Sequence, residues 1–389
     1  MNVTVPRPAH FEIGLGPSLE TVDKVSVRFH GRKLLYFGGC DYFRLSCDAS
    51  LRKAIQRGLD RFGLNVAASR VTSGNHALYV QAEKSLERFF QVESATLTSS
   101  GYFPGLIVGQ ALRGQVSLAL VEQQAHSCLA ELVQGLDCPV REFRRGDVRQ
   151  VRQLLKSSRR PARPVVLSEG VRSNDGTIAP LDRYLTVLPS RGILVVDDAH
   201  GVGVLGDHGR GTLEAQGIDS RAVVQVVTFS KAFGVYGGAV LGPAWLRAKI
   251  IAGSRAFAGN TPLPLPLVAG LLAALKRIER GAGIRRRLHA HSEFVKSTLR
   301  AAGATVPENT VPIIVLDAAS EAAERQTRQV LSSHGIYPNF IRYPGLAERG
   351  CFRFAISSAH APAHLRRLVN ALVPLVRSGR LRALDPVRR

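Results

Sequence analysis

Short apolar runs alternate with segments of helical periodicity over most of the chain. Apolar residues at helical spacing predict amphipathic helices over residues 48–62 and 79–90. Between and beyond them, apolar runs predict short buried strands over residues 95–98, 116–121, 164–168, 192–196 and 223–228. Because short buried strands that alternate with helices are typical of parallel sheets, this part of the chain predicts a mainly parallel α/β sheet flanked by helices.

A second pattern follows a group of prolines at positions 262, 264 and 266. A long helical region that reaches residue 302 precedes predicted strands over 311–316, 336–342 and 351–357, with helices over 318–334 and 362–376. This order indicates a smaller α+β domain. The sequence therefore predicts an N-terminal segment over 1–45, a large domain over 46–260, a small C-terminal domain over 261–376 and a loose tail over 377–389.

The composition is that of a large globular protein. The chain has 389 residues, of which 45% are hydrophobic, enough for more than one domain. No apolar run approaches the roughly 20 residues that cross a bilayer, and the N-terminus lacks the features of a signal peptide. We therefore expect a cytoplasmic protein without a membrane partner. Five scattered cysteines contain no Cys-x-x-Cys pair, so the sequence indicates neither a disulfide framework nor a metal site.

The charge balance is strongly basic, with 52 basic against 30 acidic residues and a net charge of +22. Such a balance favours anionic partners. The basic residues are dispersed, however, and their longest run is only residues 285–287. Because no basic tail is interleaved with aromatic residues, the pattern favours a charged, solvated surface over nucleic-acid binding.

The first segment that contains candidate catalytic residues surrounds Lys231. The sequence Thr228-Phe-Ser-Lys231-Ala-Phe-Gly follows a predicted strand and precedes Gly237-Gly238. A lysine amine can form a Schiff base where its surroundings lower its pKa. Neighbouring hydroxyls suit a phosphate, and glycines permit close backbone approach. The alternative is a solvated lysine beside a turn.

A second segment, Asp197-Asp198-Ala199-His200, follows the predicted strand over 192–196. A buried carboxylate there could pair with a ring nitrogen and make a pyridine ring an electron sink. The alternative is a helix-capping or salt-bridged aspartate. The next glycines, at 201, 203 and 206, match the G-x-G-x-x-G dinucleotide fingerprint, but that motif must open a helix directly from the strand. Here loop-forming residues intervene and follow, so we do not adopt the dinucleotide interpretation.

Together these segments closely resemble the α-oxoamine synthases of the fold-type-I pyridoxal-phosphate (PLP) superfamily, over roughly residues 31–376. The family includes 8-amino-7-oxononanoate synthase, 2-amino-3-ketobutyrate CoA ligase and serine palmitoyltransferase. The resemblance implies an α/β fold-type-I PLP transferase, with a large domain built on a mainly parallel sheet and a smaller C-terminal α+β domain. It also implies pyridoxal 5'-phosphate as the cofactor, bound to Lys231 as a Schiff base.

The same resemblance implies roles for further residues. Asp197 corresponds to the partner of the ring nitrogen, His126 to the histidine that stacks on the ring, and Lys231 to the catalytic base. Arg353 corresponds to the arginine that binds the carboxylate of the amino acid, a task that suits a guanidinium group. The remaining cofactor contacts would come from the ring-hydroxyl ligand His200, the phosphate ligand Thr228, Ser173, and the backbone of Gly101 and Tyr102 at a helix start.

Three of these assignments have ordinary alternatives. His126 could be an exposed helix histidine, residues 101–102 could be a capped helix start, and Arg353 could be a surface arginine on an edge strand.

The implied reaction condenses a small amino acid with an acyl thioester, with decarboxylation, to an α-amino ketone. The partners would be the amino acid, an acyl donor carried by coenzyme A or an acidic acyl carrier protein, and a second copy of the chain in a homodimer. The resemblance suggests an activity like that of 8-amino-7-oxononanoate synthase. The alternatives are another fold-type-I PLP reaction, such as transamination, aldol cleavage or decarboxylation, and a non-catalytic subunit.

The chain departs from the family pattern on the side of the acyl substrate and the partner subunit. The glycine-rich stretch before Ser69-Arg70 lacks its glycines. Other family residues are replaced at Tyr79 (usually histidine), Gly105 and Ala125 (usually asparagine), Ala258-Gly259 (a Ser/Thr) and near Pro344 (a threonine). Since the Schiff-base side is intact, these departures predict altered substrate specificity rather than lost PLP chemistry.

Overall fold

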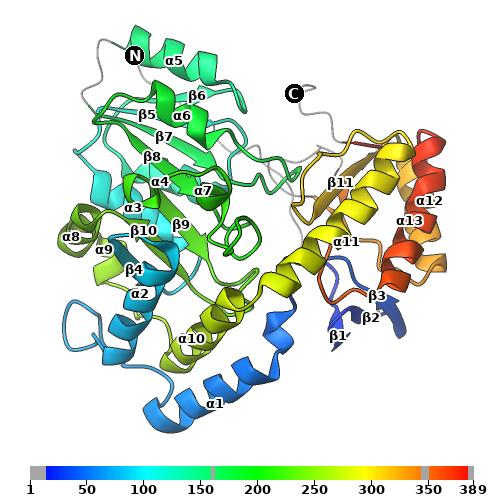
Figure 1. The fold of residues 1–389 in the computed structure, drawn as a ribbon, viewed down its shortest axis with the longest axis horizontal. Helices are drawn as coiled ribbons and strands as arrows, with labels where there is room; N and C mark the ends of the chain where they lie inside the picture. Colours follow the sequence, from blue (N-terminus) through cyan, green and yellow to red (C-terminus); the bar gives the residue numbers. More distant parts are fainter. Residues whose placement is uncertain (1–14, 159–162, 343–349, 384–389) are drawn as a thin grey trace. The chain divides into compact units, whose positions relative to one another are not determined.

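The computed structural model describes residues 15–158, 163–342 and 350–383, which form two compact units (Figure 1). Of these residues, the first unit contains 45–172 and 178–282, and the second contains those before 45, the segment 173–177 and those after 282. The predicted boundary at 45/46 lies one residue after the division at 44/45, whereas the first unit continues past the predicted boundary at 260/261. Residues 261–282 belong to the first unit because their helix packs against helices near residues 50 and 80.

A seven-stranded sheet forms the centre of the first unit, in the order β4-β10-β9-β8-β7-β5-β6. Strands β6, β5, β7, β8 and β9 are parallel to one another, whereas β10 is antiparallel to both β4 and β9. The strands are β4 (Ser94–Thr98), β5 (Leu118–Glu122), β6 (Val140–Phe143), β7 (Pro164–Glu169), β8 (Ile193–Asp197), β9 (Val224–Thr228) and β10 (Gly238–Gly242).

All five strands predicted for this region are present, each within two residues of its predicted ends. Two strands were missed. Strand β6 lies at the sheet edge and is partly exposed, so it lacks a continuous apolar run. Strand β10 begins and ends with glycine, a residue of low strand propensity.

Helices cover both faces of this sheet, because successive strand residues point to opposite sides. Val195 of β8 packs in a cluster with Leu129 and Leu132, whereas Leu194 packs in a second cluster with Tyr184. The helices of the first unit are α1 (Ala49–Phe62), α2 (Ala77–Phe90), α3 (Phe103–Leu112), α4 (Ser127–Gly135), α5 (Val148–Ser157), α6 (Leu181–Val187), α7 (Thr212–Ala215), α8 (Ala244–Gly253), α9 (Arg255–Ala258) and α10 (Leu265–Glu279), with short 3-10 turns η1 (Leu45–Cys47) and η2 (Ser220–Ala222).

The second unit has two antiparallel sheets and three helices. One sheet has the order β1-β2-β3 and the other the order β12-β13-β11-β14. The elements are β1 (Glu20–Asp23), β2 (Ser26–Phe29), β3 (Arg32–Leu35), α11 (Ala282–Ala301), β11 (Ile313–Ala318), α12 (Glu321–Ser333), β12 (Phe340–Ile341), β13 (Cys351–Ala355), α13 (Pro362–Arg377) and β14 (Leu381–Ala383).

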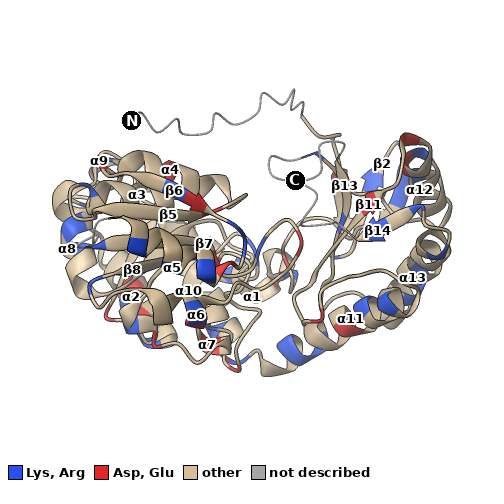
Figure 2. Ribbon diagram, turned by 90° about the horizontal axis from the view of Figure 1, so that it is seen from above, with Lys and Arg blue, Asp and Glu red and all other residues tan. Residues whose placement is uncertain are grey.

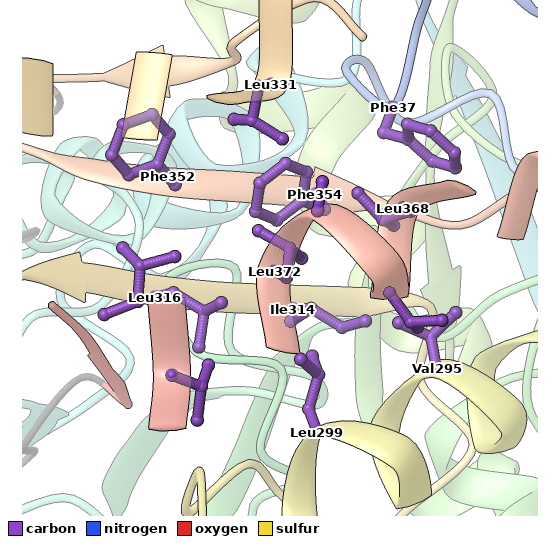
Figure 3. Packing of buried hydrophobic residues seen from close by; sticks show 14 of the residues in the cluster. Phe37, Val295, Leu299, Ile314, Leu316, Leu331, Phe352, Phe354, Leu368 and Leu372 are labelled. Carbon is purple, nitrogen blue, oxygen red and sulfur yellow. The ribbon is translucent and has the colours of Figure 1, made fainter. Parts of the chain in front are cut away.

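The core of the second unit lies between its four-stranded sheet and its helices, as Figure 3 shows. Ile314 of β11 and Phe354 of β13 pack with Leu372 of α13 and Leu299 of α11, and all four side chains are fully buried. Every second strand residue, such as Ile314 and Leu316 of β11, and an apolar face of each helix therefore build this core.

The long helical region up to 302 is present as two helices, which Arg280-Gly281 separate. Two details of the second pattern were wrong. The predicted strand over 336–342 is reduced to β12. The tail predicted to be loose from 377 onward contains β14, which pairs with β11 because Leu381 is buried in the core. Residues 384–389 of that tail, and Pro344, lie outside the described residues.

Two global features bear on partners. In the described ranges, no helix combines the length and apolar character needed to span a membrane. Figure 2 shows Lys and Arg residues on helices of both units, including α8, α11 and α13, rather than on one element. The excess of positive charge is thus distributed over the surface, as its dispersal in the sequence predicted.

The second unit buries a lysine in its interior. The ammonium group of Lys296, on α11, donates hydrogen bonds to the backbone oxygen of Asn309 at 3.0 Å and to its side-chain oxygen at 2.7 Å. The residue is fully buried, and burial lowers its pKa to about 7. Since an unfolded lysine keeps a pKa of 10.5, the unfolded chain binds a proton that the folded chain has lost between these two values.

We predict that the stability of the protein relative to a Lys296→Met variant rises between about pH 7 and about pH 10, by up to roughly 1 kcal/mol per pH unit. Below this window both states of the native chain carry the proton, so the difference between native and variant should be constant. Urea unfolding of both proteins over this pH range measures the effect. A difference that does not change with pH would contradict the assignment of a depressed lysine pKa.

Candidate active site

The candidate catalytic and cofactor-binding residues of the first unit lie at or near the carboxyl ends of β7, β8 and β9. Asp197 is the last residue of β8 and Thr228 the last of β9, and both are buried. Glu169, the last residue of β7, is in register with Asp197. Parallel strands place such ends side by side, at the sheet edge where α/β proteins bind ligands.

Lys231 lies in a tight turn just after β9. The turn is closed by a hydrogen bond from the Gly234 amide to the Lys231 carbonyl at 3.0 Å, and Phe229 and Phe233 are fully buried on either side of the lysine. Gly234 has a φ of 64°, and a Cβ there would run into the backbone of residues 45 and 46. Sequence and packing thus fix the lysine backbone, while its side chain remains partly exposed.

The amine of Lys231 lies next to His200. Its Nζ atom is 2.7 Å from the Nε2 atom of the imidazole, which is the closest polar contact that links the two sequence segments. His200 is itself buried and follows β8 by three residues. The two motifs identified in the sequence therefore meet in space.

Asp197 is held from two directions. Its Oδ1 atom accepts a hydrogen bond from the Ala199 amide at 3.0 Å, and its Oδ2 atom accepts one from the thiol of Cys128 at 2.9 Å. A carboxylate buried without donors would be costly, so these contacts stabilise it in place. The sequence did not indicate Cys128, because a buried thiol has no local signature.

His126 occupies the N-cap position of α4 rather than an exposed helix position. Its Nδ1 atom accepts a hydrogen bond from the Cys128 amide at 3.3 Å, and its own amide donates to Glu169 at 3.0 Å. Burial lowers the pKa of the imidazole; Lys231 adds to this effect and Asp197 opposes it. We infer a neutral ring with its proton on Nε2, assigned from the hydrogen-bond pattern.

Gly101, Thr228 and Gly238 pack closely at one end of the site. A Cβ at Gly101 would collide with the Thr228 side chain, and one at Gly238 would meet the backbone of residues 100 and 101. Next to them, Tyr102 is the N-cap residue of α3, and its side chain makes no capping hydrogen bond. The Tyr102 amide is directed to the Ser100 hydroxyl at 3.1 Å. A helix start without a cap, beside a hydroxyl and glycines, is a suitable cradle for a phosphate.

Asp198 has a structural task instead. It is fully buried and accepts hydrogen bonds from the Thr212 amide at 2.7 Å, the Thr212 hydroxyl at 2.5 Å and the Gln225 amide at 2.7 Å. Burial raises its pKa to about 7. The glycine-rich residues that mimic a dinucleotide fingerprint form turns around this carboxyl group, and a Cβ at Gly201 or Gly211 would collide with it. The loop prediction for this segment is thus confirmed.

Arg353 and Ser173 belong to the second unit. Arg353 lies on β13, which is flanked by β12 and β11, so it is not a surface arginine on an edge strand. Its Nε atom donates to the Ser173 carbonyl at 3.2 Å, and its Nη1 atom lies 3.5 Å from the sulfur of Cys40. The roles of Arg353 and Ser173 in binding stay predictions.

One group of side chains among the described residues has the spacing of a metal site. The ligand atoms of His126, Cys128 and Asp197 lie within 4.8 Å of one another. Metal binding requires the thiolate. Burial, together with the charge of Asp197, raises the pKa of the Cys128 thiol well above its usual value, which keeps the sulfur protonated. The geometry is therefore better explained by the thiol–carboxylate hydrogen bond.

The donor set of the first unit fits pyridoxal phosphate. Lys231 offers an amine for the aldehyde, Asp197 a buried carboxylate for the ring nitrogen, and the cradle of Gly101 and Thr228 a place for the phosphate. His126 is held near this group by the first turn of α4.

Comparison with known proteins agrees with this fit. The model of the family "Aminotransferase class I and II" matches residues 38–372. The chain belongs to this family. It is 32% identical over 361 residues to an 8-amino-7-oxononanoate synthase from Beijerinckia indica, with 91% of each chain covered. It is 29% identical over 366 residues to an enzyme of the same name from Trichlorobacter lovleyi, with 92% of this chain and 93% of the relative covered.

Among solved structures, serine palmitoyltransferase from Sphingomonas wittichii has a TM-score of 0.84 and 25% identity, covering 92% of this chain and 91% of the other. Within the aminotransferase class I and II family, the chain is therefore an α-oxoamine synthase with the fold-type-I architecture. It is a PLP-dependent acyltransferase, and pyridoxal phosphate is its cofactor.

Two departures from the α-oxoamine synthase pattern have structural explanations. Tyr79, in place of a histidine, is buried and donates a hydrogen bond to the Leu263 carbonyl at 2.7 Å. Burial raises the pKa of its phenol to about 12, so it remains a donor. Gly105, in place of an asparagine, lies against the Cys128 carbonyl, and any Cβ there would collide with that oxygen. The glycine allows α3 to approach α4 closely.

We predict that Gly101→Ala folds but lowers the affinity for pyridoxal phosphate about tenfold or more, because the new methyl group displaces the Thr228 hydroxyl from the cradle. Gly253→Ala is the matched control, since nothing lies within 4 Å of a Cβ at that position. Equilibrium dialysis of the cofactor against both apo-variants measures the effect. Equal affinities for the two variants would exclude Gly101 from the phosphate cradle.

Proposed function

We propose that this protein condenses a small amino acid, such as alanine, glycine or serine, with an acyl thioester to give an α-amino ketone, carbon dioxide and a free thiol. The observation that carries the proposal is the contact between Lys231 and His200, because it joins the two motifs at the sheet edge where Asp197 is fixed. The relatives named 8-amino-7-oxononanoate synthase support an activity of that type.

The bound cofactor supplies an electron-withdrawing pyridine ring that stabilises negative charge at the α-carbon of the amino acid. The proposed role of Asp197 is to keep the ring nitrogen protonated, since its carboxylate is fixed by the Ala199 amide and the Cys128 thiol. His126, neutral and immobilised as an N-cap, presents a flat ring without adding charge.

Proton transfer is assigned to Lys231. Its free amine would remove the proton from the α-carbon of the bound amino acid. The α-carbon then bonds to the acyl carbon, and the bond from that carbon to sulfur breaks to release the thiol. Loss of carbon dioxide from the same α-carbon and return of a proton complete the reaction. His200, 2.7 Å from the Lys231 amine, is placed to orient it.

Arg353, buried and held by the Ser173 carbonyl, is our candidate for binding the substrate carboxylate. The net charge of +22 suits the phosphates of coenzyme A or an acidic acyl carrier protein as the thiol carrier. We propose a cytoplasmic location for this activity.

We also propose a homodimer. The first unit exposes several large apolar side chains, among them Leu64 at 67% exposure and Tyr236 at 55%. Exposed apolar groups of this size suit a surface that a second copy covers. Size-exclusion chromatography with light scattering tests this proposal, and a monomer at micromolar concentration would contradict it.

We predict that Lys231→Ala abolishes the visible absorbance of the bound cofactor and lowers thiol release by at least about a hundredfold, because both the covalent link and the base are lost. Lys249→Ala, which removes an exposed lysine of α8, is the matched control and should retain both signals. Thiol release is followed with pairs of amino acids and acyl-coenzyme A of different chain lengths.

The outcome of this screen also separates rival reactions. Thiol release that requires both the amino acid and the thioester supports acyl transfer. Conversion of the amino acid without a thioester would replace acyl transfer by transamination, cleavage or simple decarboxylation. An absorbance that persists in Lys231→Ala would overturn the assignment of Lys231 itself.

A further inference from the structure

Cys128 contacts the carboxylate group of Asp197. Its side chain is buried in the first turn of α4, and its sulfur lies 2.9 Å from the Oδ2 atom of Asp197. The other carboxylate oxygen accepts the Ala199 amide at 3.0 Å. Each oxygen therefore has one donor from the protein and keeps lone-pair capacity for a further donor.

We propose that Cys128 is a positioning residue of the cofactor site, whose thiol hydrogen bond fixes the Asp197 carboxylate in the orientation that holds the proton at the pyridine nitrogen. This inference rests on the proposed role of Asp197. The Ala199 amide alone would leave the carboxyl group free to rotate about its bond to Cβ. A second donor on the opposite oxygen removes that freedom before the cofactor binds.

The direction of this hydrogen bond follows from the surroundings of the sulfur. Asp197 is a carboxylate at the end of a buried strand, and the thiol is the only one of the two groups that needs a proton to make the contact. Burial and the neighbouring negative charge both raise the pKa of the thiol. Cys128 is consequently the donor and Asp197 Oδ2 the acceptor in this contact.

A thiol is also chemically distinct from the alternatives at this position. It is a weaker donor than a hydroxyl group, so it orients the carboxylate while withdrawing less of its negative charge. A carboxylate that keeps its basicity holds the pyridine proton more firmly. A cysteine at this position thus orients the Asp197 carboxylate while withdrawing little of its negative charge.

The backbone around Cys128 makes the contact rigid. The Cys128 amide donates to His126 Nδ1 at 3.3 Å, so one turn positions both the ring of His126 and the thiol. On the other side, the Cys128 carbonyl lies against Gly105 of α3, where no side chain fits. Glycines at 109 and 135 continue this close helix contact. The replacement of the family asparagine by Gly105 is therefore linked to the placement of Cys128.

The first test detects the hydrogen bond itself in the apoprotein. The S–H stretching band of Cys128 is isolated as the infrared difference between the native protein and Cys128→Ala. We expect this band at a lower frequency in the native protein than in an Asp197→Ala background, because a carboxylate acceptor weakens the S–H bond. An identical frequency in the two backgrounds would overturn the proposal.

The second test measures the consequence for the cofactor. We predict that Cys128→Ala lowers the affinity for pyridoxal phosphate about tenfold and shifts the pH midpoint of its visible band, whereas Cys128→Ser stays within roughly twofold of the native affinity. Cys138→Ala is the matched control, because that thiol belongs to the same unit and is partly buried in the packing of α4. Circular dichroism establishes that all variants are folded.

Two results would overturn the inference. One is native affinity and an unshifted midpoint in Cys128→Ala. The other is a folded Cys128→Ser variant with the same defect as Cys128→Ala, which would assign the effect to packing rather than to a donor. Failure of the proposed function is distinguishable, since it would appear in the native protein as missing thiol release while the infrared and binding results remained intact.

Discussion

The site depends on a buried carboxylate at the end of a parallel strand. Asp197 lies where β8 stops, in register with Glu169 and beside β9. Burying a carboxylate is tolerable only where donors surround it, and here they come from the next turn of the chain and from the first turn of α4. The strand order of the sheet thus places the ends of β7, β8 and β9 side by side. The hydrogen bonds that Asp197 requires then hold the first turn of α4 against the end of β8.

The adjacent Asp198 illustrates how neighbouring acids acquire different tasks. It receives three hydrogen bonds, two from Thr212 and one from Gln225, and lies at the centre of a glycine-rich loop. Burial raises its pKa to about 7, so its environment favours the protonated form more than water does. Asp198 stabilises the loop that carries His200, while Asp197 faces Cys128 and the first turn of α4. Alternation of side chains at a strand end separates the structural acid from the chemical one.

Much of this arrangement could be predicted from the sequence, because it is encoded locally. The five apolar runs are strands since burial on both faces requires continuous apolar residues. Asp197 comes directly after one of these runs, and Lys231 lies in the turn that follows another. Features that depend on distant contacts could not be predicted. Strand β10 is recognisable only from its partners β4 and β9, and β14 only from the burial of Leu381. The contact of Cys128 with Asp197 joins residues 69 positions apart.

Two of the departures from the family pattern are explained by their contacts. Tyr79 and Gly105 are integrated into the packing: the tyrosine hydroxyl donates to a backbone carbonyl, and the glycine admits a neighbouring helix. Restoring the family residue at either position would break a buried hydrogen bond or force α3 and α4 apart, so each change requires its surroundings. Substitutions that are accommodated in this way indicate a site that has been rebuilt around an intact Lys231 turn. Altered substrate specificity stays a prediction, because these contacts explain only how the two replacements are accommodated beside the retained donors of Asp197.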